Sequence, residues 1–228
     1  MSAPNATTRL LSLVLLACTS CAGPPRDERD DKKHRGEHPH HPTSAEGWAA
    51  ALDDPARDDR QRPAEVVAAM AIREGMVVAD VGAGTGYFEP HLSRAVGASG
   101  RVLALDVEPA LVRHMQRRFE AAGLANVEAR CVASDDPGLA VGSVDRVLIV
   151  DTWHHMEDRV RYARKLREAL APAGQLVIVD YLVDAERGPP AALRVGAEAV
   201  MAELRAAGFA ARVVHESLPD QFIVAGEP

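Results

Sequence analysis

Cysteine is scarce in this sequence. Three cysteines occur in 228 residues, and Cys18 and Cys21 lie close to the amino terminus, which leaves Cys131 alone in the remainder. This distribution excludes a disulfide framework for the main part of the chain. The C-x-x-C spacing of Cys18 and Cys21 is found in zinc and redox sites, but here it ends an apolar run and has no second pair.

Positive charge is also in short supply. The chain has 26 Lys and Arg against 33 Asp and Glu, a formal net charge of -7, and only 4% aromatic residues. A negatively charged protein without a basic, aromatic-rich stripe would repel a phosphate backbone, so we expect no nucleic-acid binding. The 47% of hydrophobic and 26% of charged residues are typical of a globular protein with a substantial core. The length fits one domain with a tail.

The apolar run near the amino terminus, Leu10–Ala17, is too short to cross about 30 Å of hydrocarbon as a helix. It follows Arg9 and ends in Leu-Leu-Ala-Cys, which resembles a secretory leader with a bacterial lipoprotein box. We therefore expect residues 1–20 to be a leader, Cys18 to carry a lipid, and the protein to be a membrane-anchored periplasmic lipoprotein. Cys21 is a weaker alternative. A plain leader or a misassigned start, with a cytoplasmic location, is the other interpretation.

Residues 21–45 are rich in proline, charge and histidine and lack apolar periodicity. Such a segment buries too little apolar surface to fold, so we expect a disordered tether. Its histidines are candidate metal ligands, but a flexible polar linker also explains them, and we predict no metal site. The histidines concerned are His34, His38, His40 and His41.

From residue 46 to residue 228, strand and helix patterns alternate, which is typical of a mostly parallel sheet covered by helices. Apolar runs predict strands at 76–81, 102–105, 127–132, 144–150 and 176–179. Apolar residues at helical spacing lie between them: Leu111, Val112, Met115 and Phe119, then Val160, Ala163, Leu166 and Leu170. Near the end of the chain, a final pair of antiparallel strands is predicted by the segment ARVVHESLPDQFIVAG. The fold class is thus α/β: a Rossmann-like, seven-stranded, mostly parallel sheet with helices on both faces.

A glycine-rich loop follows the first predicted strand in VVADVGAGTGYF. Glycine lets the backbone turn sharply and approach a ligand closely. A dinucleotide-binding loop would have a small residue where Tyr87 stands, and Asp80 would repel a diphosphate but attract an ammonium group. These features favour S-adenosyl-L-methionine over NAD. The expected cofactor-binding residues here are Asp80, Gly82, Ala83, Gly84, Thr85 and Gly86.

A second acid, Asp106, ends the next predicted strand in RVLALDVEP. Folds of this kind place a carboxylate there to accept hydrogen bonds from the ribose hydroxyls of the cofactor. The alternative is that Asp106 or Glu108 caps the helix beginning at Pro109. The position of Asp106, in register after the glycine loop, favours the role of binding the cofactor.

Taken in order, these motifs resemble the class I S-adenosylmethionine-dependent methyltransferase family over roughly residues 46–226. The matching parts are Asp80 with the glycine loop, Asp106, the acids after the third strand, VDRVLIVDTWHHM and LAPAGQLVIVD. In that family, the acid after the third strand binds the adenine amino group. The resemblance therefore implies Asp135, with Ser134 or Asp136 beside it, although a surface loop with an Asp-Pro turn is the alternative.

The fourth predicted strand ends in VDTWHH, at the edge where open α/β sheets bind ligands. Histidine near its neutral pKa accepts protons readily, so Asp151, His154 and His155 are the candidate catalytic residues. One of the two histidines could instead stack or cap a helix. The Pro-Pro-aromatic tetrad of family members acting on nucleobase or amide nitrogen is missing, and the single core cysteine argues against arsenic methylation.

Before the first strand, DDPARDDRQRPAEVV resembles a segment of a poorly characterised bacterial subgroup of the family. Arg57, Gln61 and Arg62 are candidates to reach the carboxylate of the cofactor, and a solvated, charged helix start is the alternative. The segment would then cover the cofactor.

We therefore predict a methyltransferase in which a small-molecule or lipid-like acceptor attacks the sulfonium methyl in line. One alternative is a nicotinamide-dependent dehydrogenase. The other is a non-catalytic, lipid-anchored module that retains the fold, because a lipoprotein faces the periplasm whereas this cofactor is made in the cytosol.

Overall fold

The computed structural model describes residues 47, 53–54, 56–214 and 218–228. The chain divides into a unit of residues 1–41 and a unit of residues 42–228, and the described residues all belong to the second unit. The predicted leader and tether, with Cys18, Cys21 and the four tether histidines, lie outside the described residues. Within the described part, no helix has the length and apolar character needed to cross a membrane.

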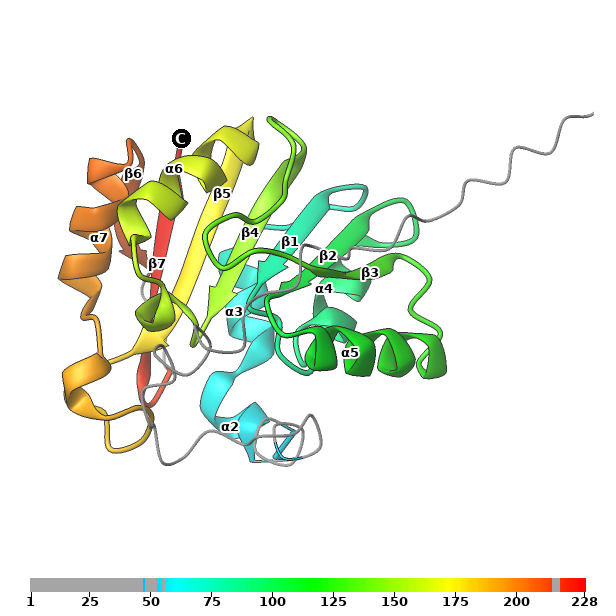
Figure 1. Ribbon diagram of the computed structural model, residues 1–228, viewed down its shortest axis with the longest axis horizontal. Helices are drawn as coiled ribbons and strands as arrows, with labels where there is room; N and C mark the ends of the chain where they lie inside the picture. Colours follow the sequence, from blue (N-terminus) through cyan, green and yellow to red (C-terminus); the bar gives the residue numbers. More distant parts are fainter. Residues whose placement is uncertain (1–46, 48–52, 55, 215–217) are drawn as a thin grey trace, which may run out of the picture. The chain divides into compact units, whose positions relative to one another are not determined.

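Seven strands form one sheet in the order β3-β2-β1-β4-β5-β7-β6, as Figure 1 shows from right to left. Pairs β1–β2, β2–β3, β1–β4 and β4–β5 are parallel, whereas β7 runs antiparallel between β5 and β6. The fold class predicted from the sequence is confirmed. The strands are β1 Val77–Val81, β2 Arg101–Asp106, β3 Val127–Cys131, β4 Val144–Val150, β5 Leu170–Tyr181, β6 Ala210–Val214 and β7 Gln221–Glu227.

Helices cover both faces of the sheet. Buried side chains of α3, α4 and α5 pack against one face, which carries Val78, Val102 and Ala104. Those of α6 and α7 pack against the other face, which carries Ala79, Leu103 and the indole of Trp153. The α-helices are α2 Arg57–Gln61, α3 Pro63–Ala69, α4 Glu89–Val96, α5 Pro109–Ala121, α6 Arg159–Ala169 and α7 Ala197–Ala206, with short 3-10 helices η1 Trp153–His155 and η2 Ala191–Leu193.

One detail of the helical pattern was wrong. Leu170 was predicted to continue the stripe of the helix before it, but α6 ends at Ala169 and Leu170 begins β5 with extended backbone. Pro172 explains the stop, since proline lacks the N–H that a helix needs and disfavours helical backbone in the residue before it. Leu170 is nevertheless buried in the same core cluster as Leu166.

The alternation of side chains along the strands decides which acids share a face. Asp80 follows Val78 by two residues and Asp106 follows Ala104 by two, so both carboxyl groups point to the side of α3, α4 and α5. Asp180 pairs with Phe222 of β7, which belongs to the core beneath α6 and α7. Asp180 therefore lies on the opposite face.

Candidate functional site

The loop between β1 and α4 brings bare backbone to the carboxyl end of the sheet. Gly82 and Gly86 have φ angles of 78° and 83°, which side chains rarely adopt. A Cβ at Gly82 would overlap Thr152, and one at Gly86 would lie 2.6 Å from the Phe119 ring. The N–H groups of Gly82 and Ala83 donate to the Leu105 carbonyl. Only glycine fits these two positions, and the loop is tied to β2.

Asp106 links that loop to the start of α5. Its Oδ2 accepts from the Gly84 N–H at 2.9 Å, and its Oδ1 accepts from the Glu108 N–H at 2.9 Å. Burial raises the pKa of Asp106, against these backbone hydrogen bonds. Glu108 caps α5 by accepting from the Ala110 N–H, so the capping alternative applies to Glu108. A carboxylate accepts about four hydrogen bonds, so two sites on Asp106 can still take ribose hydroxyls.

Asp80 is buried at the end of β1 beside a second acid, Glu89, the first residue of α4. Burial raises the pKa of Asp80, while Arg57 favours its ionised form and Asp106 opposes it. Sequence reasoning missed Glu89 because an acid in the first turn of a helix is ordinarily a solvated partner of the helix dipole. Here it is fully buried.

The segment before β1 is fastened over the glycine loop. The Arg57 guanidinium stacks 4.0 Å from the centre of the Tyr87 ring, and the Tyr87 hydroxyl donates to Asp58. Asp53 accepts at 2.8 Å from both the Thr85 hydroxyl and Arg118 of α5. Arg57 and Gln61 thus lie beside Asp151, and their contact with the carboxylate of the cofactor stays a prediction. Arg62 instead pairs with Glu65 at 3.3 Å, at the start of α3.

Asp151 is held between two carboxamides. Its Oδ2 accepts from Gln61 Nε2 at 2.6 Å, and its Oδ1 accepts from Gln221 Nε2. Burial raises the pKa of Asp151 to about 7, the charge of Asp180 acts in the same direction, and Arg57 and His154 oppose them. A carboxyl group that titrates near neutrality suits general acid or base catalysis.

Asp151 lies in a small pocket of about 100 Å3. Because the charge of Arg57 acts on both Asp80 and Asp151, this pocket adjoins the cofactor end of β1. The residues lining it are Arg57, Arg60, Gln61, Asp151, Tyr181, Arg187, Asp220 and Gln221. Sequence reasoning did not single out Tyr181, Arg187, Asp220 or Gln221, because nothing local marks them as polar neighbours of Asp151.

The two candidate histidines differ in their surroundings. His154 Nδ1 lies 2.8 Å from Asp180 Oδ1, and their side chains are 2% and 0% exposed. The ring of His155 lies 4.1 Å from that of His154, and His155 is exposed. Trp153 is buried in the core and donates to Glu203 of α7 at 2.8 Å. His154 and Trp153 therefore hold η1 against the face of the sheet that α6 and α7 cover.

The acids after β3 lie on an exposed loop. The Asp135 side chain is 66% exposed, and Ser134 is exposed as well. Lys165 of α6 donates to the Asp135 carbonyl at 2.6 Å and to Asp136 at 2.8 Å, which ties the loop to that helix. The adenine contact of Asp135 stays a prediction.

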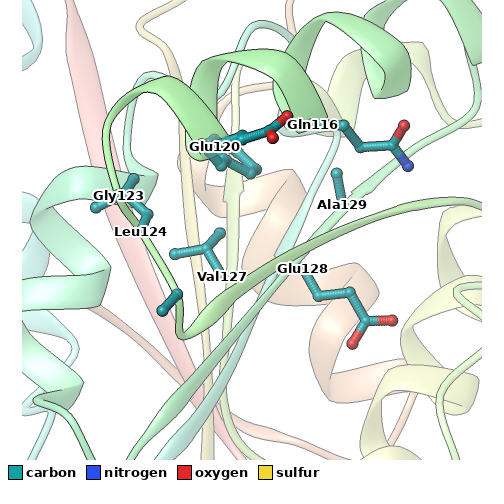
Figure 2. Close-up of a pocket in the computed structure, with 9 residues that line it drawn as sticks. Gln116, Glu120, Gly123, Leu124, Val127, Glu128 and Ala129 are labelled. Carbon is teal, nitrogen blue, oxygen red and sulfur yellow. The ribbon is translucent and has the colours of Figure 1, made fainter.

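A larger hollow of about 500 Å3 lies elsewhere, between α5 and the edge strand β3. Figure 2 shows Gln116 and Glu120 of α5 and Glu128 of β3 on its walls. It contains none of the acids described above. Among the residues that the structure describes, no cluster of three or more His, Cys, Asp or Glu could hold a metal ion.

Comparison with known proteins gives a consistent result. Residues 78–174 match the family described as "Methyltransferase domain". A crystal structure of a SAM-dependent methyltransferase from Aquifex aeolicus is 31% identical, has a TM-score of 0.74, and aligns over 78% of this chain and 95% of that one. A structure described as a possible exported protein from Bordetella parapertussis, 17% identical with a TM-score of 0.56, covers 75% of this chain and 68% of its own.

Among curated relatives, the ubiquinone/menaquinone biosynthesis C-methyltransferase UbiE of Klebsiella pneumoniae is 25% identical over 111 residues. That alignment covers 48% of this chain and 44% of the relative, so the chain spans less than half the length of this curated protein.

Proposed function

This chain belongs to the S-adenosylmethionine-dependent methyltransferases, and we propose that it methylates a small molecule whose proton is accepted by Asp151. S-adenosylmethionine is the cofactor, and it supplies an activated methyl group on a sulfonium. The residues at the end of β1 and β2 fit this group: bare glycine backbone for close approach, buried Asp80 for its ammonium, and Asp106 for its ribose hydroxyls.

The observation that carries the proposal is the position of Asp151. It follows β4, which lies beside β1, so Asp151 and Asp80 are at the same edge of the sheet and share Arg57. The hydrogen bonds from Gln61 and Gln221 hold the carboxylate in place for an acceptor in the pocket. Such positioning supplies part of the rate enhancement by aligning the acceptor, and a positioned base adds about 10²- to 10⁴-fold.

The lining of the pocket indicates the class of acceptor. Arg60 and Arg187 bring positive charge to the pocket, although each also pairs with an acid, Asp54 and Asp220 respectively. The Tyr181 ring adds an aromatic wall. An acidic hydroxyl or an enol-like carbon on a small ring suits this lining, and the C-methylation in the name of the UbiE relatives supports a carbon acceptor. A lipid-like tail on that acceptor is also part of the proposal.

A methyl-transfer assay tests this function. The full chain is incubated with methyl-labelled S-adenosylmethionine and a panel of phenols, quinols and enolic acids, and labelled products are identified by mass spectrometry. With an active acceptor, Asp151→Asn should lower turnover by about 10²- to 10⁴-fold and leave S-adenosylhomocysteine binding nearly unchanged. Asp184→Asn, which changes an exposed acid three residues after β5, is the matched control. Unchanged turnover in Asp151→Asn would contradict the role of Asp151.

We further propose that Cys18 anchors the protein to a membrane facing the periplasm. The leader-like sequence before Cys18 supports this location, and so does the fold neighbour described as a possible exported protein. The cell fractionation described in the Discussion tests it.

A further inference from the structure

Two buried carboxyl groups meet at the carboxyl end of β1. Glu89 is 0% exposed, and its Oε1 and Oε2 have no hydrogen-bond donor among the described residues. The Asp80 carboxyl lies within hydrogen-bonding reach of Glu89. Because ionised carboxylates only accept hydrogen bonds, the two acids can bond to each other only when one of them carries a proton.

The surrounding charges do not neutralise this pair. Asp106 of β2 adds negative charge next to Asp80, and the positive groups acting on the pair are Arg57 of α2 and Arg118 of α5. The charge of Arg57 is shared with Asp151, and Arg118 is paired with Asp53 at 2.8 Å. Burial raises the pKa of Glu89 well above its ordinary value, and the charge of Asp80 raises it further.

A buried pair of acids with an unfilled acceptor is suited to a cation that donates hydrogen bonds. The α-ammonium group in the amino-acid part of S-adenosylmethionine has a positive charge and three N–H donors. We propose that Asp80 and Glu89 together bind this ammonium group, and that the pair releases its shared proton to solvent when the cofactor binds. Glu89 is then a cofactor-binding residue rather than a helix-capping acid.

Proton release makes cofactor affinity depend on pH. Protonation of the pair competes with the ammonium, so affinity should rise with pH, by about tenfold per pH unit for one proton released. The inference depends on the cofactor alone, and its outcome is independent of the acceptor and of Asp151.

Calorimetric titration of the full chain tests the inference. S-adenosylhomocysteine is titrated between pH 5.5 and 7.5 in two buffers of different ionisation enthalpy, which gives the number of protons released. 5′-Methylthioadenosine is the comparison ligand, because it keeps the adenosine and the thioether but lacks the amino-acid portion, with both its ammonium and its carboxylate. We expect about one proton released with S-adenosylhomocysteine and none with 5′-methylthioadenosine. No release with the first ligand, or equal release with both, overturns the proposal.

A variant assigns the effect to Glu89. Glu89→Gln keeps the size of the side chain but cannot share a proton with Asp80, so it should bind S-adenosylhomocysteine at least about tenfold more weakly at pH 7.5 and with a smaller pH dependence than wild type. Glu120→Gln removes an exposed glutamate of α5 and should behave as wild type. A folded Glu89→Gln protein with the pH dependence of wild type refutes the role of Glu89. If the variant does not fold, the ligand comparison in the wild type decides the question.

Discussion

Replacing Asp106 by alanine should weaken both the fold and cofactor binding, by amounts that can be separated. In the free protein, the change leaves the N–H groups of Gly84 and Glu108 without their acceptor. An unsatisfied buried group costs about 1–3 kcal/mol, but Gly84 is half-buried and Glu108 is exposed, so water replaces part of the lost bonding and we expect a total loss of about 1–3 kcal/mol in the free energy of unfolding. Cofactor binding also loses the hydrogen bonds that the ribose hydroxyls donate to Asp106, which contribute about 1.5–3 kcal/mol, so the dissociation constant should rise about 10- to 150-fold.

The assay pairs denaturant unfolding with calorimetric titration of S-adenosylhomocysteine. A second ligand that lacks the ribose 2′-hydroxyl completes a thermodynamic cycle of two proteins and two ligands. Wild type should bind this second ligand more weakly than S-adenosylhomocysteine, and Asp106→Ala should bind both ligands with the same affinity. Asp106→Asn keeps one acceptor oxygen and should be intermediate in stability. If a folded Asp106→Ala protein distinguishes the two ligands as well as wild type does, Asp106 only holds the glycine loop and the reasoning about the ribose is wrong.

Four further predictions concern Asp151, His154 and Cys18. Turnover at saturating cofactor should fall as the pH drops below about 7, because Asp151 must be ionised to act as a base, and Asp151→Asn should flatten the profile. Between pH 3.8 and about 7, Asp151 holds a proton in the folded state and has lost it in the unfolded state, so its contribution to the free energy of unfolding grows as the pH is lowered through that window. In chemical unfolding, the free energy of unfolding of wild type should therefore gain about 1.4 kcal/mol per pH unit relative to that of Asp151→Asn as the pH falls. His154→Ala should cost about 1–3 kcal/mol of stability, since buried Asp180 loses the imidazole and keeps only the backbone N–H groups of His154 and Tyr181, whereas His155→Ala should cost little; equal melting temperatures would contradict the burial of the pair. Cells expressing wild type should retain the protein in membranes and those expressing Cys18→Ala should not, and soluble wild type that still carries Met1 would disprove the lipid anchor.

Sequence alone was sufficient for the fold class and for the identity of the cofactor. Strands β1, β2 and β4 are built on apolar runs, and α5 repeats apolar residues at helical spacing, so period and composition locate them without tertiary information. The glycine loop and Asp106 stand directly after strands, and the carboxyl ends of parallel strands meet at one edge of the sheet. Local pattern therefore predicted that Asp80 and Asp106 would lie close together.

The partners of these residues were decided only by the tertiary structure. Gln61 and Gln221 hold Asp151 from positions 90 and 70 residues away, because β4 lies beside β1 and the antiparallel β7 brings its first residue next to the end of β5. His154 is buried against Asp180 because β5 follows β4 in the sheet, and Glu89 meets Asp80 because α4 packs back over β1. The sequence specifies residue types and periods, whereas the pairing of distant polar groups depends on strand order and on which face each strand end presents.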